Sequence, residues 1–121
     1  MEAAQDTFIS STFWTERIGF TATLATIKKM EEQNVPEKLI HYGELINKGW
    51  SELAQKHGLE IHISGIPPLT HITFKAENPL AVQTLYTQEM LEKGYLLGAA
   101  IYTSFSYTVE IIEHFLKESD S

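Results

Sequence analysis

Two segments in the first half of the chain carry hydrophobic residues at every third or fourth position. In residues 15–33 they are Ile18, Ala22, Ala25 and Met30. In residues 36–57 they are Leu39, Tyr42, Ile46, Trp50 and Leu53. This spacing places the apolar side chains on one face of an α-helix, so the pattern predicts two successive helices. The face of the first helix is narrow and rich in alanine, which suits close packing against a large neighbour.

Local signals mark where these two helices begin and end. Thr15 is placed to cap the first turn of the first helix. Pro36 fits the first position of a new helix and disfavours helical geometry at Val35, which predicts a break between the two segments. Gly58 can adopt the left-handed conformation that ends a helix, so the second helix is expected to stop there.

Alternation of apolar and polar residues replaces the helical pattern in residues 59–64 and 69–74. A period of two is typical of half-buried strands. Pro67 and Pro68 in the intervening loop lack the backbone donor that a strand ladder needs, so the two strands form an antiparallel hairpin. A third strand is expected over residues 95–102, broken near Gly98.

Two further helices are predicted in the second half of the chain. One runs from Asn78-Pro79 to Lys93 and is closed by Gly94, and the other follows Thr108 as its N-cap. Residues 117–121 are expected to fray. The order of elements predicts an α+β fold, a small, mainly antiparallel, three-stranded sheet with helices on one face.

Length and composition limit the classes of protein to which the chain can belong. Its 121 residues, 43% of them hydrophobic, suffice for one domain with its own core. The net charge of −7 and a single arginine, Arg17, make nucleic acid an unexpected partner. No apolar run approaches the length of a membrane span, and the first residues lack the pattern of a secretory signal, so we expect no membrane association and a cytoplasmic location.

The residues that could bind a metal or act as a nucleophile form no recognisable site. His62 and His71 would lie opposite each other in a hairpin that is symmetric about Pro67, but two ligands are too few for a zinc site and the chain has no cysteine. A phosphate-binding glycine loop and a nucleophile elbow are also missing. The sequence therefore predicts no metal site and no independent catalytic residue.

Two motifs carry a resemblance to a known enzyme family, and the resemblance extends over essentially the whole chain. The motifs are Ser11-Thr12-Phe13-Trp14-Thr15-Glu16-Arg17-Ile18-Gly19 and Ser64-Gly65-Ile66-Pro67-Pro68. They resemble class III aminotransferases that use pyridoxal phosphate (PLP), in particular the glutamate-1-semialdehyde 2,1-aminomutase branch. The resemblance is to the C-terminal part of these enzymes, and it implies the C-terminal small domain of fold-type I PLP enzymes.

The resemblance also implies roles for individual residues. Thr12, with Ser11 beside it, matches the turn that binds the PLP phosphate of the neighbouring subunit, whereas three hydroxyl residues before a helix would otherwise be a loop and cap. Residues 102–108 match the segment that approaches the substrate. Tyr107 stands there in place of the histidine that is usual in the family. The Schiff-base lysine lies upstream in the family and matches no residue of this chain, so no catalytic residue is assigned.

Two functional hypotheses follow from the resemblance. In the first, residues 1–14 lead from a large PLP-binding domain, residues 15–121 form the small domain, and the chain is inactive alone and binds no PLP by itself. Its partners would be the large domain and a second subunit of the full aminotransferase or aminomutase. In the second, the chain is a free-standing interaction or regulatory module that keeps this fold. The first hypothesis further implies that residues before Trp14 are mobile in the isolated chain.

Overall fold

A computed structural model describes residues 16–121. These residues belong to two compact units, which are separated between Asn34 and Val35. In the first unit the helix α2 spans Arg17–Glu32, with Glu16 as its N-cap and without a side-chain cap bond. No residue of α2 is buried. The predicted cap, Thr15, lies outside the described residues, as do the predicted boundary at residue 14 and the segment expected to be mobile.

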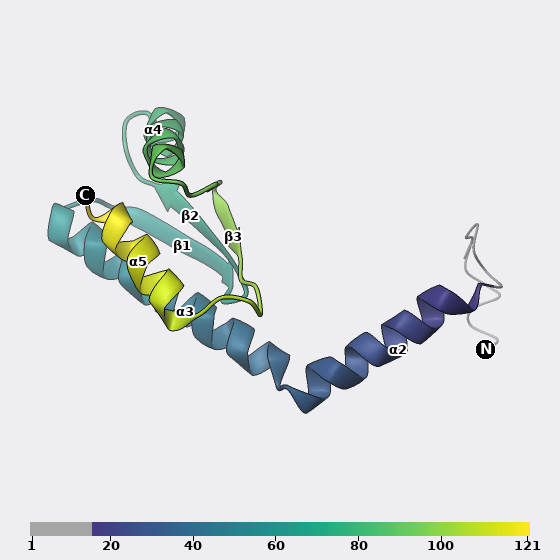
Figure 1. Ribbon diagram of the computed structural model, residues 1–121. Helices are drawn as coiled ribbons and strands as arrows, with labels where there is room; N and C mark the ends of the chain where they lie inside the picture. Colours follow the sequence, from purple (N-terminus) through teal and green to yellow (C-terminus); the bar gives the residue numbers. More distant parts are fainter. Residues whose placement is uncertain (1–15) are drawn as a thin grey trace. The chain divides into compact units, whose positions relative to one another are not determined.

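The second unit combines three helices with a three-stranded sheet (Figure 1). Its elements are α3 (Val35–His57), β1 (Ile61–Ile66), β2 (Leu69–Phe74), α4 (Pro79–Glu92), β3 (Ala100–Tyr102) and α5 (Val109–Ser119). The strands lie in the order β1-β2-β3, and both pairs are antiparallel. The predicted α+β fold with an antiparallel three-stranded sheet is thus confirmed.

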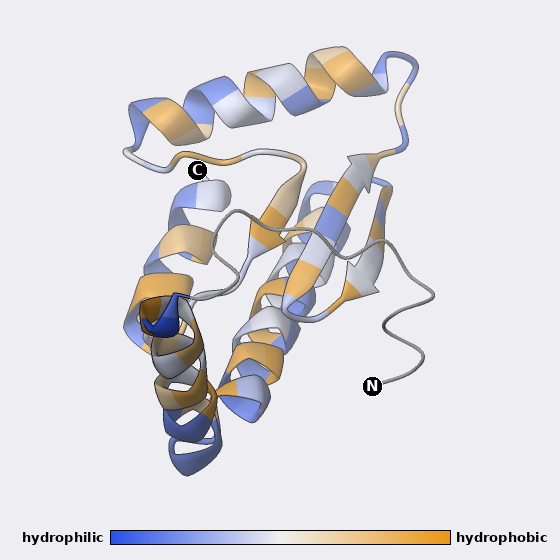
Figure 2. Ribbon diagram, turned by 90° about the vertical axis from the view of Figure 1, so that its right-hand side faces the viewer, coloured by the Kyte–Doolittle hydropathy of each residue, from blue (hydrophilic) through white to orange (hydrophobic). Residues whose placement is uncertain are grey.

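The core lies between one face of the sheet and the helices. Alternate residues of β2 are buried, and α3 and α5 lie side by side across this face (Figure 1). The hydropathy colouring in Figure 2 shows hydrophobic and hydrophilic positions alternating along the strands and helices, as elements with one buried side require. The buried cluster comprises Ile46, Trp50, Ile72, Phe74, Met90, Leu97, Ile112 and Phe115.

The predicted helix ends are found where the local signals placed them. Gly58 and Gly94 adopt the left-handed conformation, with φ of 65° and 89°. The side chain of Asn78 accepts a hydrogen bond from the backbone of Ala81, and that of Thr108 accepts one from Ile111. These four positions need only their own neighbours to act, which explains why sequence alone located them.

Several boundaries differ from the predictions. β1 extends to Ile66, two residues beyond the predicted strand, because Gly65 and Ile66 still pair with β2. α3 begins at Val35, one residue before Pro36. The proline is tolerated in the first helical turn because the N–H that it lacks would have no intrahelical partner there. β1 begins at Ile61, because the N–H of Leu59 bonds to the carbonyl of Ala54 and closes α3. β3 is short because the N–H of Tyr95 likewise closes α4, through the carbonyl of Met90.

The prediction that residues 117–121 fray is wrong. α5 continues to Ser119, and the residues after it bond to other elements. The ammonium of Lys93 donates to the carbonyl of Glu118 at 2.7 Å and to the hydroxyl of Ser121 at 2.6 Å. These bonds span 25 and 28 residues along the chain and have no local signal in the sequence.

Candidate functional site

The predicted phosphate-binding residues, Thr12 and Ser11, lie outside the described residues. Their role toward PLP therefore stays a prediction. The other segment that the sequence analysis singled out, residues 102–108, runs from the last residue of β3 to the N-cap of α5 and is described in full.

Backbone and side-chain hydrogen bonds fix the segment 102–108 to the rest of the unit. The N–H of Thr103 donates to the carbonyl of Pro68 at 3.0 Å. Its hydroxyl lies within bonding distance of two carbonyl oxygens, those of Leu39 at 3.2 Å and Pro68 at 3.3 Å. The segment is thereby held to the hairpin turn and to the first half of α3.

The serine hydroxyl groups of this segment form hydrogen bonds within its own turn. The hydroxyls of Ser104 and Ser106 are 2.8 Å apart, and the N–H of Tyr107 donates to the carbonyl of Ser104 at 3.0 Å. The ammonium of Lys38 lies 4.6 Å from the centre of the Phe105 ring, a cation–π contact. The predicted strand end and the Thr108 cap are both present, and no two titratable groups meet in a shared buried pocket here.

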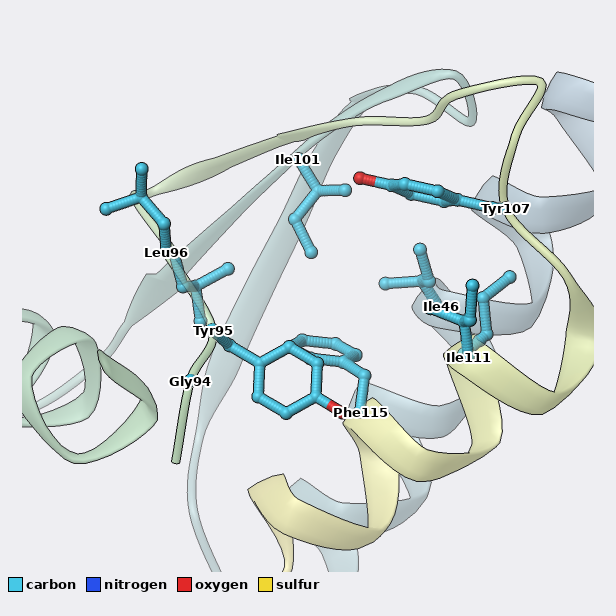
Figure 3. A pocket seen from close by; sticks show the side chains of 10 residues that line it. Ile46, Gly94, Tyr95, Leu96, Ile101, Tyr107, Ile111 and Phe115 are labelled. Carbon is cyan, nitrogen blue, oxygen red and sulfur yellow. The ribbon is translucent and has the colours of Figure 1, made fainter. Parts of the chain in front are cut away.

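An apolar pocket of about 250 Å³ opens beside Tyr107. Figure 3 shows the Tyr107 ring lying across the pocket, with its hydroxyl oxygen next to Ile101. The walls come from three elements and the loop before β3, and they include Ile46, Tyr95, Leu97, Ile101 and Phe115. Sequence analysis did not identify this pocket, because the residues around it are separated by up to about 70 positions and each has the pattern of an ordinary core residue.

No lysine of the chain lies in an environment suited to covalent binding of an aldehyde. All lysines lie in the described part, and all except Lys93 are exposed. The side chain of Lys28 is 77% exposed and that of Lys48 is 74% exposed, each paired with a glutamate one helical turn away. Lys93 is partly buried, but its ammonium is bound by Glu118 and Ser121. The described residues therefore offer no desolvated amine of the kind that a Schiff-base enzyme uses.

The histidines of the hairpin are not directly opposite each other. Each faces a hydroxyl residue, with His62 paired with Thr73 and His71 paired with Ser64. The register is centred between Pro67 and Pro68, which places the two imidazoles in diagonal positions on the exposed face of the sheet. Among residues 16–121 no group of three or more histidine, aspartate or glutamate side chains could hold a metal ion.

Three titratable groups have shifted pKa values: Tyr86, Glu110 and Asp120. A hydrogen bond with the side chain of Thr108 lowers the pKa of Glu110 in the first turn of α5. The other two groups lie near the end of α5. Burial raises the pKa of Tyr86, whose hydroxyl bonds to Ser119 and accepts from the indole N–H of Trp50 at 3.1 Å. Hydrogen bonds from Lys56 and then His57 lower the pKa of Asp120. The bonds of Tyr86 and Asp120 attach the end of α5 to its neighbours.

The chain is similar to several aminotransferases. It is 24% identical over 121 residues to the aminopentol aminotransferase of Sphingopyxis macrogoltabida, covering 98% of this chain and 29% of that enzyme. It is 25% identical over 127 residues to the 3-aminobutyryl-CoA aminotransferase of Cloacimonas acidaminovorans (strain Evry), covering 95% of this chain and 31% of the enzyme. No protein-family model matches the chain.

A solved structure shares the fold. The structure of the PLP internal aldimine form of the FumI protein of Sphingopyxis sp. MTA144 superposes with a TM-score of 0.85 at 25% sequence identity. The match covers 98% of this chain and 29% of that protein, so the chain spans less than a third of the length of the relatives it matches. By sequence and fold, the chain therefore matches a domain or fragment of class III aminotransferases, the family that its motifs resemble.

Proposed function

We propose that this chain is the C-terminal small domain of a PLP-dependent class III aminotransferase and that it catalyses no transamination by itself. The extent of the similarity, about three-tenths of each relative, supports a part of an enzyme rather than a whole one. The relatives are named as aminotransferases, which favours transamination over the aminomutase reaction that the sequence motifs also allowed.

The observation that carries this proposal is the environment of the lysines. PLP chemistry in this family needs an amine that reacts with the cofactor's aldehyde, and such an amine is activated by desolvation or by a neighbouring cation. The lysines of this chain are exposed or bound to other groups. The described residues do not fit a covalently held PLP, so the lysine that holds it would belong to another part of the full enzyme.

The role proposed for this domain in the full enzyme is to bind the phosphate of a cofactor that is held by the neighbouring subunit. Thr12 and Ser11 would donate hydroxyl hydrogen bonds to a PLP phosphate held by the large domain of a second subunit. PLP supplies the electron sink of the reaction when it is bound there. A large PLP-binding domain and a second subunit are thus the proposed partners, and the cytoplasm is the proposed location.

Titration of the purified chain with PLP, followed by borohydride reduction, tests the proposal. We expect weak, non-saturating absorbance changes and low labelling spread over several exposed lysines. Pyridoxamine phosphate, which has no aldehyde, is the matched control and should leave no trapped adduct. A saturable adduct at one lysine, with one PLP per chain, would overturn the proposal and favour a protein that binds PLP on its own.

A further inference from the structure

The pocket beside Tyr107 is a hollow that the packing of residues 35–121 leaves open. It is partly open to solvent, its walls are mainly apolar, and its volume is about 250 Å³. An apolar cavity of roughly 150 Å³ lined by leucine, isoleucine and phenylalanine is known to accommodate benzene. The pocket therefore has room for one aromatic ring with a small substituent.

The chemistry of the described walls excludes a charged ligand. No lysine, arginine, histidine, aspartate or glutamate is among the described residues that line the pocket. A charged group placed there would lose its hydration without gaining a partner, which is strongly unfavourable. A neutral molecule with mainly apolar surface is the class of ligand that fits.

Two tyrosine hydroxyls border the pocket, and they differ in their availability. The hydroxyl of Tyr95 is already bound to Nδ1 of His114. The hydroxyl of Tyr107 has only a long contact, 3.5 Å, to the carbonyl oxygen of Tyr102. A bond of this length is weak, so the Tyr107 hydroxyl can turn to a ligand at little cost.

The aromatic side chains at the base of the pocket favour a ring as the occupant. Tyr95 and Phe115 already meet edge to face, with their centroids 5.5 Å apart and an interplanar angle of 64°. Aromatic rings add favourably to such arrangements beyond the area that they bury. Figure 3 shows these two rings below the space that Ile101 and Tyr107 cover.

We propose that this pocket binds a small neutral aromatic molecule with a single polar group, such as a phenol, which hydrogen-bonds to the hydroxyl of Tyr107. This proposal does not depend on the proposed role in PLP binding, because the described walls of the pocket all belong to the unit Val35–Ser121 and include neither Thr12 nor Ser11. Its occupant needs no cofactor, and a failure of either proposal leaves the other standing.

Titration with phenol and with toluene, observed by methyl NMR of the full chain, tests the site. Both probes should shift the methyl signals of Ile101 and Ile112 saturably, and phenol ring protons should show intermolecular NOEs to them. Tyr107→Phe should weaken phenol binding about three- to tenfold, the usual range for one hydrogen bond. Toluene binding should change less than about twofold, because toluene makes no such bond.

A blocking variant separates the pocket from general surface binding. Ile111 lines the pocket but is 47% exposed, so Ile111→Trp can fill the opening without entering the core. Leu80, 79% exposed on α4 and outside the pocket, gives the matched control Leu80→Trp. We expect phenol binding to be lost in the first variant and kept in the second.

Three results would overturn the proposal. The first is an absence of saturable shifts with phenol, and the second is equal phenol affinity in Tyr107→Phe and the unchanged chain. The third is phenol binding that survives in a folded Ile111→Trp variant. If that variant does not fold, the NOEs from phenol to Ile101 and Ile112 decide, and their absence in the unchanged chain counts against the site.

Discussion

The hydroxyl of Thr70 donates a 2.6 Å hydrogen bond to Oδ1 of Asn47, joining the start of β2 to the middle of α3. Thr70 has no exposed surface, and Asn47 is half-buried. When the donor is removed, the acceptor loses its partner at a site where water has only partial access, which is unfavourable. The pair is therefore a polar contact that joins β2 to α3 within an otherwise hydrophobic core.

Thr70→Val should destabilise the domain by about 1 to 3 kcal/mol, because it keeps the shape of the side chain and removes the donor. Urea unfolding of the full chain measures the change. Thr73→Val is the matched control, since Thr73 lies on the exposed face of the same strand and should change stability by less than about 0.5 kcal/mol. Equal effects of the two substitutions would show that the Thr70–Asn47 bond contributes nothing specific.

Gly43 allows α3 to approach the hairpin turn. A Cβ at this position would lie 1.8 Å from the carbonyl oxygen of Pro67, and the obstacle is backbone rather than a flexible side chain. Gly43→Ala should therefore cost about 3 kcal/mol or more in unfolding free energy, above the usual range for overpacking. Thermal unfolding followed by circular dichroism measures it.

The control for this substitution is Gly19→Ala. Gly19 lies within α2, and an added Cβ there would meet nothing within 4 Å. Alanine is better than glycine in a helix by about 1 kcal/mol, so this variant should keep or increase helix content. Similar losses in both variants would indicate that helix flexibility, not the contact with Pro67, explains the effect at Gly43.

The sequence predicted those parts of the fold that depend on neighbouring residues. The caps at Asn78 and Thr108 and the left-handed glycines at Gly58 and Gly94 are local, and all four are in place. The alternation in residues 69–74 likewise gave the bounds of β2, and α4 and α5 lie where the periodicity and caps placed them.

Features that join distant residues could not be predicted in this way. The bonds from Lys93 to the end of α5 make residues 117–121 part of the fold, although their composition is typical of a frayed tail. The pocket beside Tyr107 is of the same kind, because its walls meet only in the folded unit.

Asp120 should make the attachment of the last helical turn dependent on pH. Lys56 donates to its carboxylate at 2.6 and 2.7 Å and His57 lies 2.8 Å away, which lowers the pKa of Asp120. A carboxyl whose pKa is lowered on folding stabilises the fold above its unfolded pKa, about 4, and loses that effect as the pH falls through the lower, folded value.

The melting temperature of Asp120→Asn should therefore lie below that of the unchanged chain at pH 6 to 7. The difference should shrink progressively below about pH 4. Glu113→Gln, which removes a carboxylate from the exposed face of α5, should show a smaller difference at neutral pH. A difference for Asp120→Asn that stays constant down to acid pH would rule out the charged carboxylate as the cause.

Thr12→Val in a full-length enzyme that contains this domain tests the proposed contact with the PLP phosphate. The substitution keeps the shape and removes a charge-assisted hydrogen bond worth about 1.5 to 3 kcal/mol. PLP affinity should fall about tenfold or more, since about 1.4 kcal/mol corresponds to one decade. Thr7→Val, in the same segment, is the matched control and should leave the affinity within about twofold.

In the isolated chain neither substitution should change the free energy of unfolding, because the phosphate that Thr12 would bind belongs to another subunit. If Thr12→Val bound PLP as tightly as the unchanged enzyme, Thr12 would be an ordinary loop residue and the proposed phosphate site would have no support.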